Sequence, residues 1–201
     1  LRYARPVSPG VMTGPDYVLF SPTELEDERL YTVESWPDAE LEPELSEWRR
    51  EIELRLPEGE NPETVALARR LRSESESDAA FVDAVLGRFT RESFAYSLNP
   101  PLLPDLNPVD AFMFQTRNGF CEHYAAAFVV TMRAAGVPAR VVAGYQGGEV
   151  NPVNRTVIVH QFDAHAWAEV WLAGRGWVRV DPTAAVSPDR VEWGLERALA
   201  A

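Results

Sequence analysis

The spacing of apolar and polar residues changes in character near residue 60. Before that point the chain is rich in proline and glutamate, and only two short segments, residues 17–20 and 30–35, have the pattern typical of strands. Acidic stretches between and after these segments indicate solvated loop or helix surface. We therefore expect residues 1–60 to form an N-terminal arm or a partial β-rich segment ahead of a more regular domain.

Beyond residue 60, apolar residues recur at the spacing of amphipathic helices. Asn61 followed by a proline is typical of an N-cap and a first helical position, and it predicts a helix that ends near Arg72. A second helix follows, with an apolar face formed by Phe81, Val85, Leu86 and Phe89. Residues 94–104 contain too many prolines for regular structure, and Asn107 before a proline predicts another short helix.

The next helix carries the single cysteine of the chain. Its apolar face is formed by residues at positions i, i+4, i+7, i+11 and i+14, namely Cys121, Ala125, Phe128, Met132 and Ala135. Gly136 and Pro138 are typical of residues that end a helix. Cys121 is therefore expected in the first turn, where the helix dipole stabilises a thiolate and lowers a cysteine pKa. A small core residue would fit the same position, so this pattern alone leaves both interpretations open.

Four segments downstream of this helix predict strands, because they are short, rich in apolar residues and separated by turn residues. They are residues 139–145, 156–160, 165–172 and 177–181. Together with the preceding helices they predict an α+β fold, in which a small antiparallel sheet of about four strands packs on the cysteine-bearing helix.

The register of the last two strands follows from cross-strand chemistry. If Trp171 faces Trp177, then Glu169 faces Arg179, and an aromatic pair and an opposite-charge pair lie on one surface. Each pair stabilises a sheet by roughly 0.2–1 kcal/mol, and a shift by one residue would break both pairs. We therefore predict this register.

The predicted register places Asp181 diagonal to His165 on one face, about 7–8 Å away between backbones. An imidazole beside a carboxylate can act as a base with its orienting partner, and Cys121 is the candidate nucleophile. His123 follows Cys121 by two residues on a helix, so it does not face the thiol and is expected at the rim. His160 has no carboxylate predicted beside it and is expected to be peripheral. A zinc site made by Cys121, His165 and Asp181 is disfavoured, because zinc sites with one cysteine usually carry two histidines.

Composition limits the classes of function. The chain of 201 residues is 46% hydrophobic and 25% charged, which is typical of a globular protein with one core. With 19 basic and 31 acidic residues, its net charge of −12 argues against nucleic acid or an anionic membrane as a partner. One cysteine excludes an internal disulfide. Neither a membrane-length apolar run nor a signal-peptide pattern is present, so we expect a soluble piece.

Three stretches resemble the motifs of a known family in sequence, order and separation. They are "GFCEHYAAAFVVTMRAAGVPARVV", "DAHAWAEVW" and "GWVRVDPT", and they are similar to the motifs of the transglutaminase-like superfamily, which has a papain-like fold. The resemblance is strongest over residues 117–183 and extends more weakly back to residue 61. It is greatest to bacterial membrane-anchored members of the TgpA type. It implies a catalytic domain at residues 61–190 and a helical tail at residues 191–201.

This resemblance implies acyl transfer from glutamine side chains of proteins. Cys121 would attack the amide, His165 would pair with the thiolate and protonate the departing ammonia, and Asp181 would orient the imidazole. The Cys121 backbone N–H and the Tyr96 side chain are the expected oxyanion donors. The acyl group would pass to a lysine or another primary amine, or to water, which gives deamidation. The resemblance also implies a periplasmic domain of an inner-membrane protein, whose membrane segments lie outside this chain.

No cofactor or metal is expected, since no EF-hand-like acidic loop is present, and activity should not be sensitive to chelators. Two other classes of function stay open. A cysteine protease or amidase would use the same three residues with water as the acceptor, and the sequence does not decide which acceptor enters the site. A non-catalytic protein-binding module would keep the fold, but it would be free to lose the three polar residues. The absence of lysine would limit self-crosslinking, although a GC-rich genome is the simpler explanation.

Overall fold

The computed structural model describes residues 3–189 of the chain. Packing contacts divide the chain into two compact units, Leu1–Pro43 and Glu44–Ala201. The helical tail expected at residues 191–201 lies outside the described residues.

The second unit begins earlier than the boundary expected at residue 60. Its first helix, α1 (Glu47–Leu54), packs on the long helix α5 (Cys121–Ala134). A buried ion pair accounts for this contact, because Glu53 is only 5% exposed and accepts a hydrogen bond from Arg133 at 3.1 Å. A charged residue of the proline- and glutamate-rich region is thus buried in the second unit, where Arg133 neutralises it.

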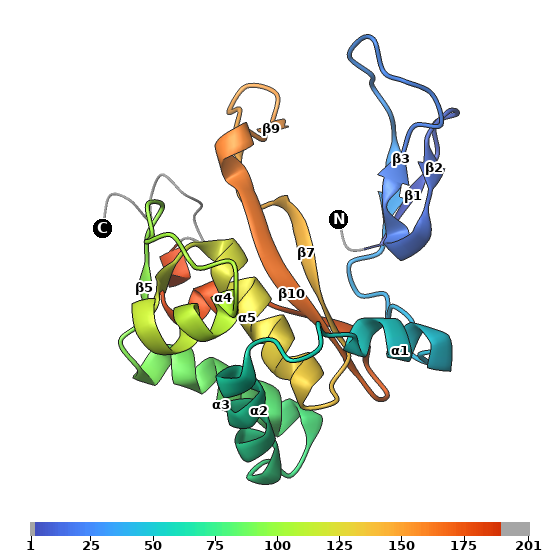
Figure 1. Ribbon diagram of the computed structural model, residues 1–201. Coiled ribbons are helices and arrows are strands. Elements are labelled where there is room, and N and C mark those ends of the chain that lie inside the picture. The colour runs from blue at the N-terminus through green and yellow to red at the C-terminus, as the bar shows by residue number, and fades with distance from the viewer. Residues whose placement is uncertain (1–2, 190–201) are drawn as a thin grey trace. The chain divides into compact units, whose positions relative to one another are not determined.

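The first unit is a small β-rich segment, drawn in blue in Figure 1. Its antiparallel pairs are β1 (Ala4–Pro6) with β4 (Val33–Ser35) and β2 (Met12–Thr13) with β3 (Leu19–Phe20). The strand predicted at residues 17–20 is shorter than expected, because Asp16 and Tyr17 have positive φ angles and form the turn before β3. The ring of Tyr3 packs against those of Tyr17 and Trp36, with centroids 5.2 and 5.6 Å apart.

The helices of the second unit follow the predicted order. They are α1, α2 (Pro62–Ser73), α3 (Asp78–Arg91), the short α4 (Pro108–Asp110) running into a π-helical turn (Ala111–Thr116), and α5. The predicted helices after Asn61, through Phe81 and from Cys121 are confirmed. The amphipathic spacing in each segment was therefore a sufficient signal for a helix.

The amino ends of α2 and α4 cap each other. Asn61 and Asn107, the predicted N-caps, adopt positive φ, and neither side chain caps its own helix. Instead, the Asn61 side-chain oxygen accepts the N–H groups of Val109 and Asp110 at 2.9 and 3.2 Å, and the Asn107 oxygen accepts the Asn61 N–H at 2.7 Å. The Asp110 carboxylate accepts two N–H groups from the first turn of α2, at 2.9 and 2.7 Å. The expectation that each asparagine caps its own helix is therefore wrong. The amino ends of the two helices lie side by side, so the side chains at each end accept the free N–H groups of the other.

A three-stranded antiparallel sheet lies against α5. Its order is β11 (Gly176–Val180), β10 (Ala164–Leu172) and β7 (Ala139–Tyr145). The strand predicted at residues 156–160 is shorter, as β9 (Val157–Ile158), and pairs with β8 (Glu149–Val150) outside this sheet. The expectation of about four strands is therefore wrong. Gly147 and Gly148 take positive φ angles and turn the chain away after β7.

The core lies between the sheet and the helices, with α5 in the middle (Figure 1). The predicted apolar face of α5 is buried, since Ala125, Phe128 and Met132 are each 0% exposed and Cys121 is 8% exposed. This packing of α5 on a small antiparallel sheet confirms the predicted α+β fold class.

The predicted register of β10 and β11 is confirmed. Trp171 faces Trp177 and Glu169 faces Arg179. Glu169, however, forms its ion pair with the strand on the opposite edge of β10. There it faces Arg140 of β7, and the two side chains meet at 2.7 Å. The predicted pair involved only β10 and β11, whereas the partner of Glu169 comes from the third strand, β7.

Candidate active site

Cys121 is the first residue of α5, and the chain before it is held by close packing. A Cβ on Gly119 would lie 2.7 Å from the Cβ of His123 and 2.8 Å from the ring of Phe112, so only glycine fits there. His123 Nδ1 in turn accepts the N–H of Phe120 at 3.3 Å. His123 is half-buried at the helix start, in agreement with the expected rim position.

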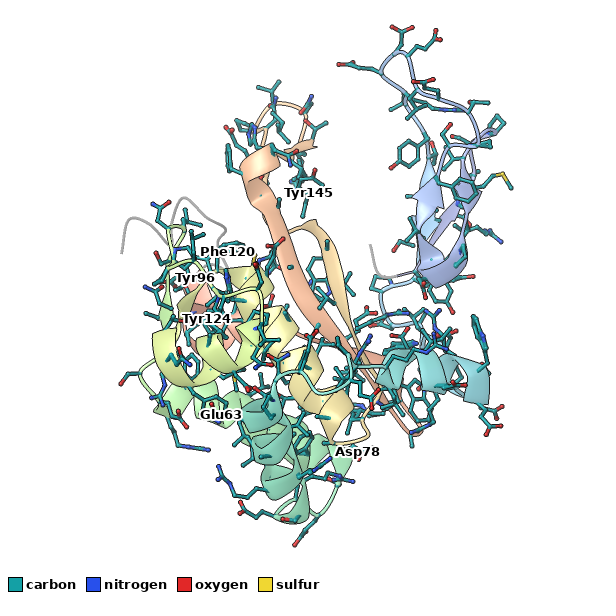
Figure 2. The ribbon with its side chains drawn as sticks, in the orientation of Figure 1. Glu63, Asp78, Tyr96, Phe120, Tyr124 and Tyr145 are labelled. Carbon is teal, nitrogen blue, oxygen red and sulfur yellow. The ribbon has the colours of Figure 1, made fainter. Side chains whose placement is uncertain are left out.

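Tyr96 is held near this helix start by a two-residue parallel pair, β5 (Ala95–Tyr96) with β6 (Asn118–Gly119). The Tyr124 hydroxyl, from the second turn of α5, donates to the Ala95 carbonyl oxygen at 2.7 Å. Burial raises the pKa of Tyr124, so its hydroxyl keeps its proton and remains a donor. Figure 2 shows Tyr96, Phe120 and Tyr124 gathered at this end of the unit.

His165 and Asp181 form the pair that the sequence predicted. His165 Nε2 and Asp181 Oδ2 are 2.8 Å apart, and the two side chains are 0% and 8% exposed. Strand β11 ends at Val180, so Asp181 begins the following turn, where its other oxygen accepts the Thr183 N–H at 3.2 Å. A carboxylate can only accept hydrogen bonds, so Nε2 carries the proton and donates it.

The electrostatics of this pair favour the ionised forms. Burial acts to lower the pKa of His165, but the hydrogen bonds with Asp181 and Cys121 and the charges of both groups outweigh it and raise the pKa. Burial acts to raise the pKa of Asp181, but the bonds and charges of His165 and Arg179 hold it below its ordinary value. The other ring nitrogen of His165, Nδ1, is buried and makes no well-formed hydrogen bond within residues 3–189. Since Nε2 is taken by Asp181, Nδ1 is the ring nitrogen left to interact with the Cys121 thiol, which lines the same cleft.

Arg179 supports this pair, and its part in the site was not predicted from the sequence. Its guanidinium donates to Asp181 Oδ2 at 3.2 Å and to the side-chain oxygen of Gln146. It also lies 4.4 Å from the ring centroid of Trp167, and that ring stacks on His165 at 6.1 Å and 27°. The sequence did contain a signal for this arrangement. Arg179 and Asp181 are two residues apart in the predicted strand, so their side chains lie on the same face.

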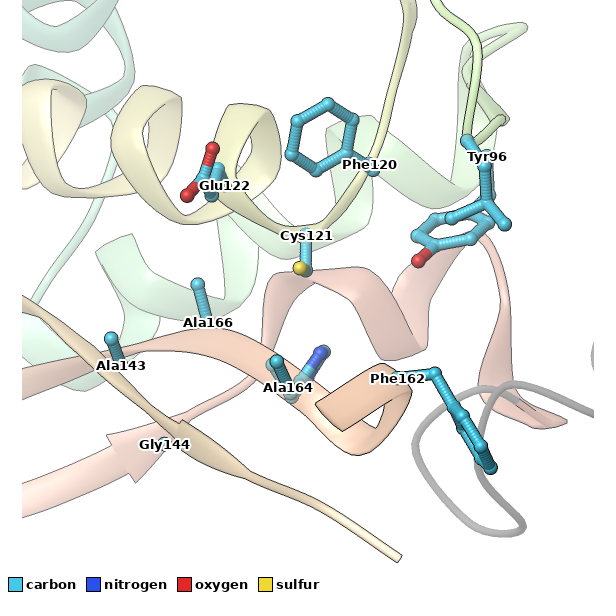
Figure 3. Close-up of a pocket in the computed structure, with 11 residues that line it drawn as sticks. Tyr96, Phe120, Cys121, Glu122, Ala143, Gly144, Phe162, Ala164 and Ala166 are labelled. Carbon is cyan, nitrogen blue, oxygen red and sulfur yellow. The ribbon is translucent and has the colours of Figure 1, made fainter. Parts of the chain in front are cut away.

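An open cleft of about 280 Å³ reaches Cys121 (Figure 3). Its lining is mainly apolar and consists of Tyr96, Leu98, Phe120, Cys121, Glu122, Ala143, Gly144, Phe162, Ala164, His165 and Ala166. In Figure 3 the Tyr96 hydroxyl points toward the Cys121 sulfur, and Phe162 lies at the same end of the cleft. Residues 99–108 contribute nothing to this lining, so the proline-rich segment does not close the cleft.

His160 lies apart from the lining of this cleft, but it does have a carboxylate beside it. Its Nε2 is 3.8 Å from Glu149, and its ring stacks on Phe162 at 4.8 Å. The expectation that no carboxylate accompanies His160 is therefore wrong, because the β8–β9 hairpin folds Glu149 back beside it. Within residues 3–189, no three His, Cys, Asp or Glu side chains are grouped as a metal site. No helix in the same range combines the length and apolarity that a membrane span requires.

Comparison with known proteins agrees with this geometry. The family model described as the transglutaminase-like superfamily matches residues 65–182. A protein-glutamine gamma-glutamyltransferase of Pseudomonas aeruginosa is 51% identical over 176 residues, which are 88% of this chain and 26% of that protein. The chain thus spans about a quarter of the length of this curated relative.

Solved structures extend the likeness to the fold. The crystal structure of the periplasmic domain of TgpA from Pseudomonas aeruginosa has a TM-score of 0.93 and 46% identity, over 98% of this chain and 68% of that one. A crystal structure of the same domain bound to ethylmercury has a TM-score of 0.90 and 46% identity, over 94% and 68% of the two chains. The match to the family model, the fold and the sequence likeness together lead to one conclusion: this chain belongs to the transglutaminase-like superfamily.

Proposed function

We propose that this chain is the catalytic domain of a protein-glutamine γ-glutamyltransferase. The observation that carries the proposal is the 2.8 Å pair of His165 and Asp181, with His165 and Cys121 lining the same open cleft. The name of the 51% identical relative supports the same reaction. The catalytic unit comprises the expected domain of residues 61–190 together with α1, whose Glu53 is buried against Arg133 of α5.

In the first half of the reaction, the Cys121 thiolate attacks the carbonyl carbon of a glutamine side chain. The raised pKa of His165 keeps the imidazole charged beside the thiolate, and Nδ1 then delivers its proton to the departing ammonia. The C–N bond breaks as the thioester forms. The Tyr96 hydroxyl and the Cys121 N–H stabilise the oxyanion of the tetrahedral intermediate, since donors placed where charge develops lower the barrier most.

In the second half, a primary amine attacks the thioester. Neutral His165 takes a proton from the amine nitrogen as the new C–N bond forms and the C–S bond breaks, which restores the thiolate and the charged imidazole. Water in place of the amine gives a glutamate and therefore deamidation. Asp181 keeps Nε2 protonated and Nδ1 directed at the sulfur throughout both halves.

The proposed location is the periplasm, because the matching solved structures are periplasmic domains. Membrane anchoring would come from segments outside this chain. Protection of the domain from added protease in intact cells, and its loss when the outer membrane is permeabilised, is the expected result. Protection that persists until the inner membrane is lysed would contradict this location.

The proposed activity is tested by following ammonia release and incorporation of fluorescent cadaverine into dimethylated casein, whose own lysines are blocked. Wild type should give both signals, and Cys121→Ala should give neither while keeping the thermal stability of the wild type. Ammonia release without incorporation would favour a deamidase over a transglutaminase. Cleavage of casein peptide bonds in place of both signals would favour the protease interpretation, and silence in all three measurements would favour a binding module.

A further inference from the structure

The cleft extends to both sides of Cys121, and its two ends differ in chemistry. Figure 3 shows Tyr96 and Phe162 on one side of the sulfur, and Glu122, Ala143 and Ala166 on the other. The Tyr96 end carries the proposed oxyanion donor, so the carbonyl group of a glutamine is directed to that side. The Glu122 end stays open for the second substrate.

Glu122 is the one charged carboxylate in the lining of the cleft. It is the second residue of α5 and its side chain is exposed to solvent. No arginine within residues 3–189 forms an ion pair with it, and the chain contains no lysine. A carboxylate without a cation of its own, at the edge of an apolar cleft, favours a cationic ligand.

The floor beneath this carboxylate is built from very small residues. Ala143 and Ala166 face each other across β7 and β10, and Gly144 follows them in the lining. The missing Cβ of Gly144 makes room on the other face of the strand, because a Cβ there would lie 2.7 Å from the ring of Trp167. A trough floored by methyl groups suits an unbranched alkyl chain, and the carboxylate above it suits an ammonium group.

We propose that the Glu122 end of the cleft is the acceptor subsite, and that Glu122 selects cationic primary amines such as the side chain of lysine. This inference rests on the proposed function and names the class of its second substrate. The alkyl chain of the amine lies over Ala143 and Ala166, and its ammonium group pairs with Glu122.

The chemical step remains balanced with a cationic acceptor. The ammonium group releases one proton to solvent as it leaves the carboxylate for the thioester. The neutral nitrogen attacks the carbonyl carbon, the C–S bond breaks, and the second proton passes to His165 as proposed above. Glu122 thus binds and concentrates the acceptor, and it exchanges no proton with the reacting atoms.

The inference is tested by competition between a cationic and a neutral acceptor in the intact chain. Cadaverine is the cationic probe, hydroxylamine is the neutral one, and dimethylated casein is the glutamine donor. In Glu122→Gln, the ratio of the KM for cadaverine to that for hydroxylamine should rise about fivefold, the size expected for one solvent-exposed ion pair. The effect is expected in KM because the ion pair is broken before the nitrogen attacks. Glu122→Asp, which keeps the charge, should retain most of the wild-type ratio.

A matched control separates this local effect from the overall acidity of the chain, whose net charge is −12. Asp83→Asn removes the same charge from an exposed position on α3, outside the lining of the cleft, and should leave the ratio unchanged. An unchanged ratio in Glu122→Gln, or an equal rise in Asp83→Asn, would overturn the inference while leaving the proposed function intact. A wild type that forms neither ammonia nor hydroxamate would overturn the proposed function, and this inference with it.

Discussion

Replacing Asp181 by asparagine removes one charge from the site and keeps the shape of the side chain. The asparagine oxygen can still accept the bond from His165 Nε2, so the imidazole keeps its orientation. The charge that favours the imidazolium is lost, however, and the nearby cation Arg179, 3.2 Å from Asp181, is left without its carboxylate partner. Burial already acts to lower the pKa of His165, so this pKa should fall in the variant.

The size of the effect follows from the kind of hydrogen bond that is changed. A bond to a charged group contributes about 1.5–3 kcal/mol and a neutral one about 1 kcal/mol, so the exchange costs about 0.5–2 kcal/mol of stabilisation of the imidazolium. At about 1.4 kcal/mol for each factor of ten, the population of the thiolate–imidazolium pair near neutral pH should fall by roughly 2- to 30-fold.

Alkylation of Cys121 by iodoacetamide measures this population directly, because the chain has one thiol and no other cysteine contributes. Near neutral pH, Asp181→Asn should react more slowly than wild type by the factor given above. The two proteins should converge at alkaline pH, where a thiolate forms without the imidazolium. Asp83→Asn serves as the charge-matched control, and equal rates for wild type and Asp181→Asn near neutral pH would refute the argument.

Three further predictions concern the oxyanion, the helix ends and acid stability. Tyr96→Phe should lower kcat for ammonia release by about 10²–10³-fold with little change in KM, and an unchanged kcat would remove Tyr96 from the mechanism. Asp110→Ala leaves the buried Thr64 N–H and hydroxyl without the acceptor that they reach at 2.7 and 2.6 Å, so urea denaturation should show a loss of about 3 kcal/mol. The exposed Asp83→Ala should cost less than about 0.5 kcal/mol, and equal losses would contradict the capping role. The pKa of Asp181 lies below its ordinary 3.8, so its stabilising contribution is present above that value and is lost as pH falls through the lowered pKa. Wild type should therefore lose stability in acid more steeply than Asp181→Asn, and parallel curves would show that the carboxylate does not stabilise the fold.

Local patterns predicted a large part of this molecule. The face of α5 that carries Cys121 followed from the spacing of its apolar residues, and the structure buries that face. The register that pairs Trp171 with Trp177 followed from cross-strand chemistry, and it brings Asp181 to 2.8 Å from His165. These features depend on residues within one helix or on two neighbouring strands joined by a short turn, so the information needed to predict them is contiguous in the sequence.

Other features depend on which distant segments meet. Asn61 and Asn107 have the sequence of ordinary N-caps, yet each bonds to the other's helix end across 46 to 49 positions of chain. Glu169 was expected to pair with Arg179, but it took Arg140 from a third strand. A polar group can bond to any partner that the fold brings within about 3 Å. The sequences of two neighbouring elements do not show which partners other elements supply.

The sequence by itself determined the main helices after residue 60, the register of β10 with β11, and the pairing of His165 with Asp181. Tertiary structure alone decided that an open cleft reaches Cys121, that Arg179 supports Asp181, and that Glu122 borders the same cleft as the thiol. The reason is that helical and strand periodicity act over a few residues, whereas a cleft and its charges arise only where elements distant in the chain pack together.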